Sequence, residues 1–133
     1  MRFLSIYKNV ERNTPPTPEE MARMGKVIEE GMKAGYLLAT EGCMPTALGA
    51  CVRRSEGNVT VTDGPFTEAK EVVGGYAIFD ARSKAHMLKW TERFMNLHKI
   101  HMPGWEGECE VRQIPEVGQE PCGQTHETQA AAE

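Results

Sequence analysis

The sequence predicts an α+β fold, with two helices on one face of a mainly antiparallel sheet. Three observations lead to this prediction. Short segments rich in aromatic and β-branched residues alternate with two longer segments whose apolar residues recur every three or four positions. The order along the chain is strand, helix, strand, hairpin, strand, helix, strand. The length of 133 residues is that of a single domain.

The first strand and the first helix carry clear local signals. Residues 3–7, FLSIY, are typical of a central strand that is buried on both faces. Thr17 is the expected N-cap of a helix, Pro18 takes its first position, and Glu20 completes a capping box. Gly35 is expected to end this helix in the left-handed conformation. The predicted apolar stripe consists of Met21, Met24, Ile28, Gly31 and Met32.

The remaining elements follow from periodicity and turn residues. Strands are predicted at residues 36–42, 75–81 and 107–114. Residues 47–62 are predicted to form a hairpin that turns at Glu56-Gly57-Asn58 and adds antiparallel strands to the sheet. Ser83 is the expected N-cap of the second helix. Its apolar stripe is interpreted as core, in preference to an aromatic ligand box, and consists of Met87, Trp90, Phe94 and Leu97.

This order of elements predicts a ferredoxin-like βαββαβ arrangement with an extra hairpin. Both helices would then cover one face of the sheet and leave the other face open. The strands at 3–7 and 75–81 are apolar on both faces, so the open side would expose a sizeable apolar surface. A second copy packed sheet against sheet would remove that surface from water. We therefore expect a homodimer.

Composition limits the classes of partner and the compartment. The net charge of −4, with acidic and basic residues interspersed, disfavours a nucleic-acid surface. No apolar run approaches the ~20 residues of a membrane span. The opening MRFLSIYKNV turns polar too early for a secretory signal, and the four cysteines include no C-x-x-C, so we expect a cytoplasmic protein with reduced thiols. Residues 1–115 are predicted as the domain and 116–133 as a mobile tail.

The connection at residues 63–74, DGPFTEAKEVVG, is the main candidate site. Its turn residues alone explain a tight corner, with the glycines at 74 and 75 allowing a bulge. Its length, however, exceeds the ~2–6 residues of common connections and is typical of a ligand-binding loop. Carboxylates beside aromatic rings would suit a small-molecule pocket. The candidate ligand-binding residues are Asp63, Pro65, Phe66, Glu71 and Tyr76.

Two other features could carry chemistry. His98 and His101 lie three residues apart and could both reach one cation, but no third ligand is evident, and a polar helix end is the preferred interpretation. Cys43, beside Gly42 in a predicted loop, could be a reactive thiol if a positive group lay nearby. We expect neither a metal nor a cofactor.

The motif V-T-D-G-P-F-x-E-x-K-E-x-x-G-G-[YF], here residues 61–76, resembles the signature of the DGPF branch of the YCII-related proteins. The resemblance extends to PEEM, to GYLLATEG and to the terminal EVRQI, and it covers roughly residues 1–115. It implies a dimeric α+β barrel of ferredoxin-like halves. It also implies a cleft near the dimer-facing sheet, to which the DGPF loop contributes.

Three functions remain open at this level. The first is a dimer that binds a small ligand in a pocket beside the DGPF loop. The second is an enzyme, a lyase or a hydrolase-like catalyst, with Asp63 or Glu71 as the base. The third is a regulatory partner of an extracytoplasmic-function sigma factor, which the resemblance suggests. A His-Asp pair known from the wider superfamily cannot be transferred, because all four histidines lie in the second half of this chain.

Overall fold

The computed structural model describes residues 1–12, 15–101 and 104–118, with the side chains of 97–101 left out. The elements in chain order are β1 (Arg2–Asn9), α1 (Pro18–Ala34), β2 (Leu37–Gly42), the short 3-10 helix η1 (Thr46–Leu48), β3 (Ala50–Ser55), β4 (Asn58–Asp63), β5 (Val72–Asp80), α2 (Lys84–His101) and β6 (Gly107–Ile114). This order confirms the predicted α+β fold. The predicted mobile tail lies almost entirely outside the described residues.

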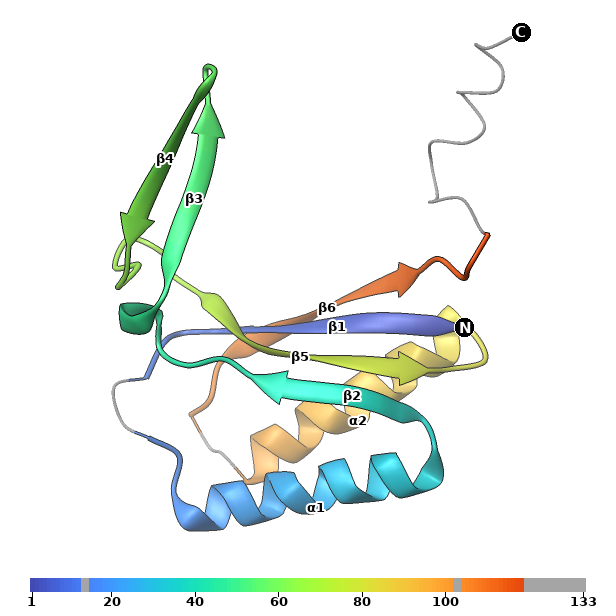
Figure 1. The fold of residues 1–133 in the computed structure, drawn as a ribbon. Helices are drawn as coiled ribbons and strands as arrows, with labels where there is room; N and C mark the ends of the chain where they lie inside the picture. Colours follow the sequence, from blue (N-terminus) through green and yellow to red (C-terminus); the bar gives the residue numbers. More distant parts are fainter. Residues whose placement is uncertain (13–14, 102–103, 119–133) are drawn as a thin grey trace, which may run out of the picture.

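Four strands form one antiparallel sheet in the order β2-β5-β1-β6. With β3 and β4 set aside, this is the strand order of a ferredoxin-like fold, and β1 is a central strand as predicted. Both helices lie on the same side of the sheet, and its other side is open (Figure 1). The core lies between the sheet and α2. It consists of Phe3, Ala81 and Met87, with Phe79, Trp90 and Val111 packed against them.

The first residues of both helices confirm the N-caps that the sequence predicted. The Thr17 hydroxyl accepts a hydrogen bond from the amide of Glu20, and the Glu20 carboxylate accepts one from the amide of Thr17. Gly35 ends α1 with φ of 85°, in the left-handed region that favours glycine. The Ser83 hydroxyl accepts from the amide of His86 at the start of α2. These caps satisfy amides that have no partner within the helix.

The residues predicted for the apolar stripe of α1 are partly wrong. Met21 and Met32 are 63% and 44% exposed, whereas Gly31 is buried. The face that meets the sheet is centred on Met24 and Gly31 and includes Val27, which places the two exposed methionines at its margin. Gly31 marks the closest approach to the sheet, because a Cβ there would lie 2.9 Å from the Cβ of Leu37.

The hairpin forms, but it does not extend the sheet. Strands β3 and β4 make a separate two-stranded ribbon, and every residue of both strands is exposed. We call residues 50–63 the arm. It projects from the sheet on the side opposite the helices (Figure 1). Its turn has Glu56 at φ 52° and Gly57 at φ 83°, which is the two-residue type I′ geometry. At its base, the Gly64 amide donates to the carbonyl of Gly49, which holds both ends of the ribbon together.

Strand β5 begins at Val72, three residues earlier than predicted. The pairing of β1 with β5 shifts between Tyr7 and Lys8, because Tyr7 lies opposite Gly75 and Lys8 lies opposite Val73. Gly74 is therefore the bulged residue, which confirms the bulge expected there. The connection between β4 and β5 is correspondingly shorter than expected and comprises residues 64–71, which we call the β4–β5 loop.

The open face of the sheet has an apolar centre and charged margins. Cross-strand pairs place Leu4 opposite Ile78 and Ile6 opposite Tyr76 on this face. Strand β6 contributes charged residues to the same face, and Lys8 donates to Glu110 at 2.7 Å. The Lys8 pKa is raised, mainly by its hydrogen bond to Glu110. The uncovered surface predicted from the sequence is thus centred on the two central strands, and Leu38 of the edge strand β2 is also 47% exposed.

Candidate functional site

The β4–β5 loop is held against the body by one buried threonine. Thr46 is 8% exposed, and its amide and hydroxyl both donate to the carboxylate of Glu11, each at 2.7 Å. The same hydroxyl accepts a hydrogen bond from the amide of Phe66 at 3.1 Å. One side chain therefore connects three segments: the end of β1, the 3-10 helix and the β4–β5 loop.

Gly64 allows the loop to approach the 3-10 helix this closely. A Cβ at position 64 would lie 1.7 Å from the carbonyl oxygen of Thr46, a separation that no real contact shows. The peptide bond between Gly64 and Pro65 is cis. This part of the motif is therefore architecture, since glycine is required by the neighbouring backbone.

A cleft of about 560 Å³ opens beside this anchor. We call it the loop cleft. Its volume falls within the ~300–1,000 Å³ of small-molecule sites. Its polar and sulfur-containing lining comes from Asn9, Glu11, Arg12, Cys43, Met44 and Thr46. Its remaining lining comes from Pro15, Pro16, Pro45, Val72, Val73, Gly74 and Trp105. The cleft thus lies between the ends of two sheet strands and the anchor of the β4–β5 loop.

Charges in the loop cleft are already partly organised. The two hydrogen bonds from Thr46 lower the pKa of the Glu11 carboxyl below its ordinary value of 4.5. Arg12 donates to the carboxylate of Glu20 at 3.3 Å, which leaves further guanidinium donors for other partners. Cys43 is exposed at the cleft, and its amide donates to the carbonyl of Gly74.

The lining of the loop cleft includes none of the five residues predicted as ligand-binding. Asp63 and Pro65 are exposed, whereas Phe66, Glu71 and Tyr76 are partly buried. Phe66 belongs to the anchor through its backbone amide. Glu71 contributes to the raised pKa of Lys8, and Tyr76 lies on the open face of the sheet opposite Ile6. Their role in binding stays a prediction.

Sequence reasoning missed the residues that line the loop cleft. Glu11 and Thr46 are 35 residues apart and belong to segments that look like ordinary polar loops. Trp105 follows a Pro-Gly break and carries no motif. The Pro-Pro pair at 15 and 16 was a weak sign of a rigid wall. Only the fold brings these segments together.

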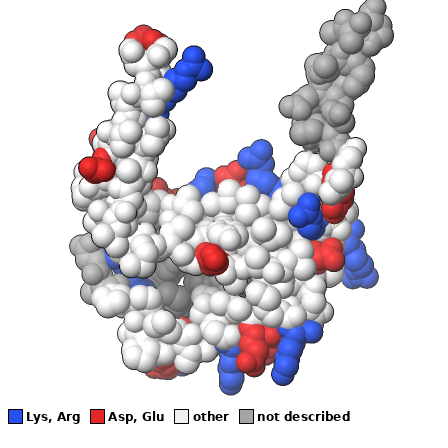
Figure 2. All heavy atoms as spheres, viewed as in Figure 1, with Lys and Arg blue, Asp and Glu red and all other residues white. Residues whose placement is uncertain are grey.

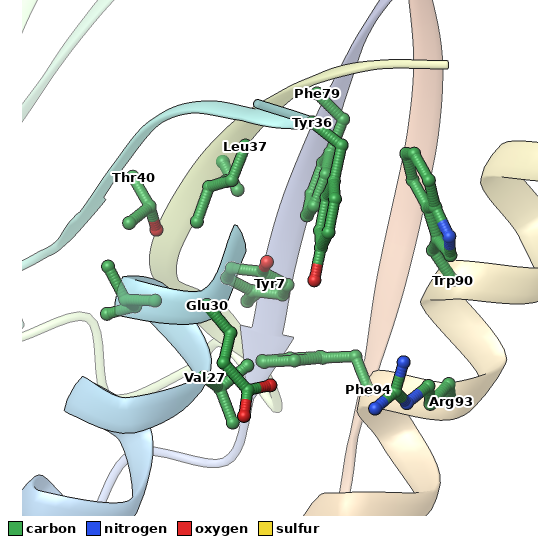
Figure 3. A pocket seen from close by; sticks show the side chains of 12 residues that line it. Tyr7, Val27, Glu30, Tyr36, Leu37, Thr40, Phe79, Trp90, Arg93 and Phe94 are labelled. Atoms are coloured by element: carbon green, nitrogen blue, oxygen red, sulfur yellow. The ribbon is translucent and has the colours of Figure 1, made fainter. Parts of the chain in front are cut away.

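A second, smaller cavity lies between the sheet and the two helices. Its volume is about 70 Å³, well below the ~150 Å³ of an apolar cavity that holds benzene. Figure 3 shows its aromatic rings beside Glu30 of α1 and Arg93 of α2. Tyr36 and Trp90 have ring centroids 4.4 Å apart, and Tyr7 stacks on Phe94 at 5.1 Å. The rings fill the space themselves, which agrees with the prediction that the α2 stripe is core.

The described residues contain neither a cluster of metal ligands nor a membrane-spanning helix. Among the side chains that the structure describes, no three from His, Cys, Asp and Glu lie close enough to hold a metal ion. The side chains of His98 and His101 lie outside that part. Neither helix, over its described residues, combines the length and the hydropathy that a membrane span requires.

A ferredoxin-like domain with a cleft at one end of its sheet defines a class of small α+β proteins, and comparison with known sequences narrows that class. The sequence profile of the YCII-related domain matches residues 1–99, so the chain belongs to the YCII-related family. It is 32% identical over 76 residues to an uncharacterized protein of Rhizobium meliloti (strain 1021). That match covers 57% of this chain and 61% of the relative, so the chain spans less than two thirds of the relative's length.

Proposed function

We propose that this YCII-related protein is a homodimer that binds a small organic ligand in the loop cleft. The observation that carries the proposal is the cleft itself: about 560 Å³, lined on one side by the anchor of the β4–β5 loop. A mostly apolar wall with a few polar groups at defined positions is the usual composition of a small-molecule site. The smaller aromatic cavity offers no comparable volume.

The lining favours a ligand with an apolar body and an anionic group. Val72, Val73 and Trp105 supply an apolar wall, and Arg12 is the cation among the lining residues. Glu11 already accepts two hydrogen bonds from Thr46, so its charge is directed toward the protein. A carboxylate on the ligand could take the guanidinium donors that Glu20 leaves open.

The homodimer is supported by the open face of the sheet. Leu4, Ile6 and Ile78 lie on that face at the two central strands, while the helices cover the opposite side. These side chains are half-buried in the single chain, and an apolar surface that no other element covers is typical of an association site. A two-fold pairing of identical faces is the commonest way to bury one.

No observation favours catalysis over binding. Asp63, the base in the catalytic alternative, is exposed and lies outside the lining of the loop cleft. Glu71, the other candidate base, lies outside that lining as well. Binding is therefore the function that the geometry supports best.

Calorimetric titration tests the proposal with probes of matched shape and opposite charge. Benzoate, phenylacetate and hexanoate carry a carboxylate on an apolar body, whereas benzylamine carries a cation. We expect carboxylates to bind and benzylamine not to bind. Arg12→Gln should weaken carboxylate binding about tenfold, because a hydrogen bond to a charged group contributes ~1.5–3 kcal/mol and 1.4 kcal/mol is a factor of ten.

Arg23→Gln is the matched control. Arg23 is also a residue of the α1 region paired with a glutamate, Glu19, but it does not line the loop cleft. Its substitution should leave the carboxylate Kd within about twofold of the unchanged protein. Equal losses from both substitutions, or no carboxylate binding at millimolar concentration, would contradict the assigned site.

A further inference from the structure

One face of the arm carries its three valines, together with Arg54 and Asp63, and the other face is polar. In its register, Val52 pairs with Val61, and Val59 pairs with Arg54, so these side chains lie on the same face. We call this the valine face. Cys51, Arg53, Thr60 and Thr62 alternate with them and lie on the other face. Such alternation is typical of a strand that is buried on one side.

The valine face is exposed in the single chain. Val52, Val59 and Val61 are 69%, 64% and 66% exposed, and Leu48 at the base of the arm is 72% exposed. A two-stranded hairpin on its own is at best marginally stable in water. Figure 2 shows the arm projecting clear of the body with a mostly uncharged surface. The pattern of the sequence therefore calls for a cover that this chain does not provide.

The position of the arm indicates what that cover is. The arm projects on the uncovered side of the sheet (Figure 1). Its strands, Ala50–Ser55 and Asn58–Asp63, reach roughly 20 Å at ~3.3 Å per residue. Two sheets that pack face to face are only ~10 Å apart. A second copy stacked on the open face must therefore lie alongside the arm.

We propose that the valine face of the arm packs against the second copy and forms part of the dimer interface. This inference rests on the proposed homodimer and adds the segment that holds it together. The arm stands on the same side of the sheet as the apolar centre formed by Leu4, Ile6 and Ile78. By two-fold symmetry each copy contributes one arm, so each valine position of this face is buried in both copies of the dimer.

The test compares Val61→Lys with Thr62→Lys. The two positions are neighbours on β4, are both exposed in the single chain, and lie on opposite faces of the arm. Sedimentation velocity over a range of protein concentrations gives the dimerisation Kd of each variant. Val61→Lys should raise that Kd at least tenfold, the value of burying about one valine side chain. Thr62→Lys should change it by less than about twofold.

Val59→Lys and Thr60→Lys form a second pair with the same prediction. They decide the question if Val61→Lys does not fold, as judged by circular dichroism. If the unchanged protein is a dimer and the valine and threonine variants raise the dimerisation Kd equally, or neither raises it, the role of the arm is overturned while the homodimer is not. A wild type that stays monomeric at all concentrations would overturn both the homodimer and the role of the arm.

Discussion

Replacing Gly64 by alanine tests whether the β4–β5 loop is held as described. The new Cβ would lie 1.7 Å from the carbonyl oxygen of Thr46 and 2.6 Å from its carbonyl carbon. Both neighbours are backbone atoms, so no side chain can rotate away to relieve the contact. The loop and the 3-10 helix must separate by about 1.3 Å to restore a contact of 3.0 Å.

The expected effect of Gly64→Ala is set by that displacement. Forcing an extra methyl group into a packed site costs about 1–3 kcal/mol in the free energy of unfolding. For a domain of this size, that corresponds to a fall in Tm of roughly 4–12 °C. A separation of this size also exceeds the reach of the hydrogen bond from the Phe66 amide to the Thr46 hydroxyl, now 3.1 Å.

Calorimetry of Gly64→Ala beside Gly49→Ala provides the assay. Gly49 lies in the same corner, with extended backbone at φ −111° and ψ −176°, and a Cβ there would have ordinary contacts at 3.6 and 3.9 Å. Gly49→Ala should therefore leave the Tm unchanged or slightly raised. Hydrogen exchange of the Phe66 amide should become faster by about tenfold or more in Gly64→Ala alone. Equal Tm values for the two variants would refute the close approach.

Three further predictions follow from the caps and the titratable groups. Thr17→Ala should lower the free energy of unfolding by about 1 kcal/mol in chemical denaturation, because the α1 capping box is lost. The Glu11 pKa is lowered by hydrogen bonds from Thr46, so the contribution of Glu11 to stability is present above pH 4.5 and is lost as the pH falls through the lowered value. The amide chemical shift of Thr46 should change over the same acid range, and Glu11→Gln should remove that change. Burial raises the pKa of the Cys109 thiol to about 11, so at pH 8 an aromatic disulfide reagent should modify exposed Cys43 well before Cys109; equal rates would contradict this.

Local signals were sufficient for most of the fold. The capping box at Thr17 and Glu20 involves residues three apart, and the left-handed cap at Gly35 needs only its own dihedral angles. Apolar runs with aromatic and β-branched residues, FLSIY and GYAIFDA, located the two strands that lie at the centre of the sheet. The α1 stripe was partly wrong because helical periodicity gives the width of a face but not its rotation toward the sheet.

Local sequence signals did not predict where the arm lies relative to the sheet. Two-residue alternation and the turn at Glu56-Gly57-Asn58 predicted a hairpin over residues 47–62, and the hairpin exists at residues 50–63. Its separation from the sheet depends on the corner at Thr46 and Gly64, where two backbones meet. The motif DGPF marked this corner, but the sequence could not reveal which atoms lie beside Gly64.

Identification of the loop cleft also required the fold. Its lining comes from five stretches of chain, and Glu11 and Trp105 lie nearly at opposite ends of the domain. Three of its lining residues, Val72, Val73 and Gly74, belong to the connection that the sequence singled out as the main candidate site. Tyr76, one of the predicted residues, lies instead on the open face of the sheet, opposite Ile6.

Amide chemical-shift mapping with benzoate tests the central claim, that the loop cleft takes a small anionic ligand. The ¹⁵N-labelled protein would be titrated with benzoate, and benzylamine would serve as the control. We predict saturable shifts concentrated at Asn9, Cys43, Gly74 and Trp105, which line the cleft. Shifts that do not saturate, or that centre on Trp90 in the aromatic cavity, would contradict the claim.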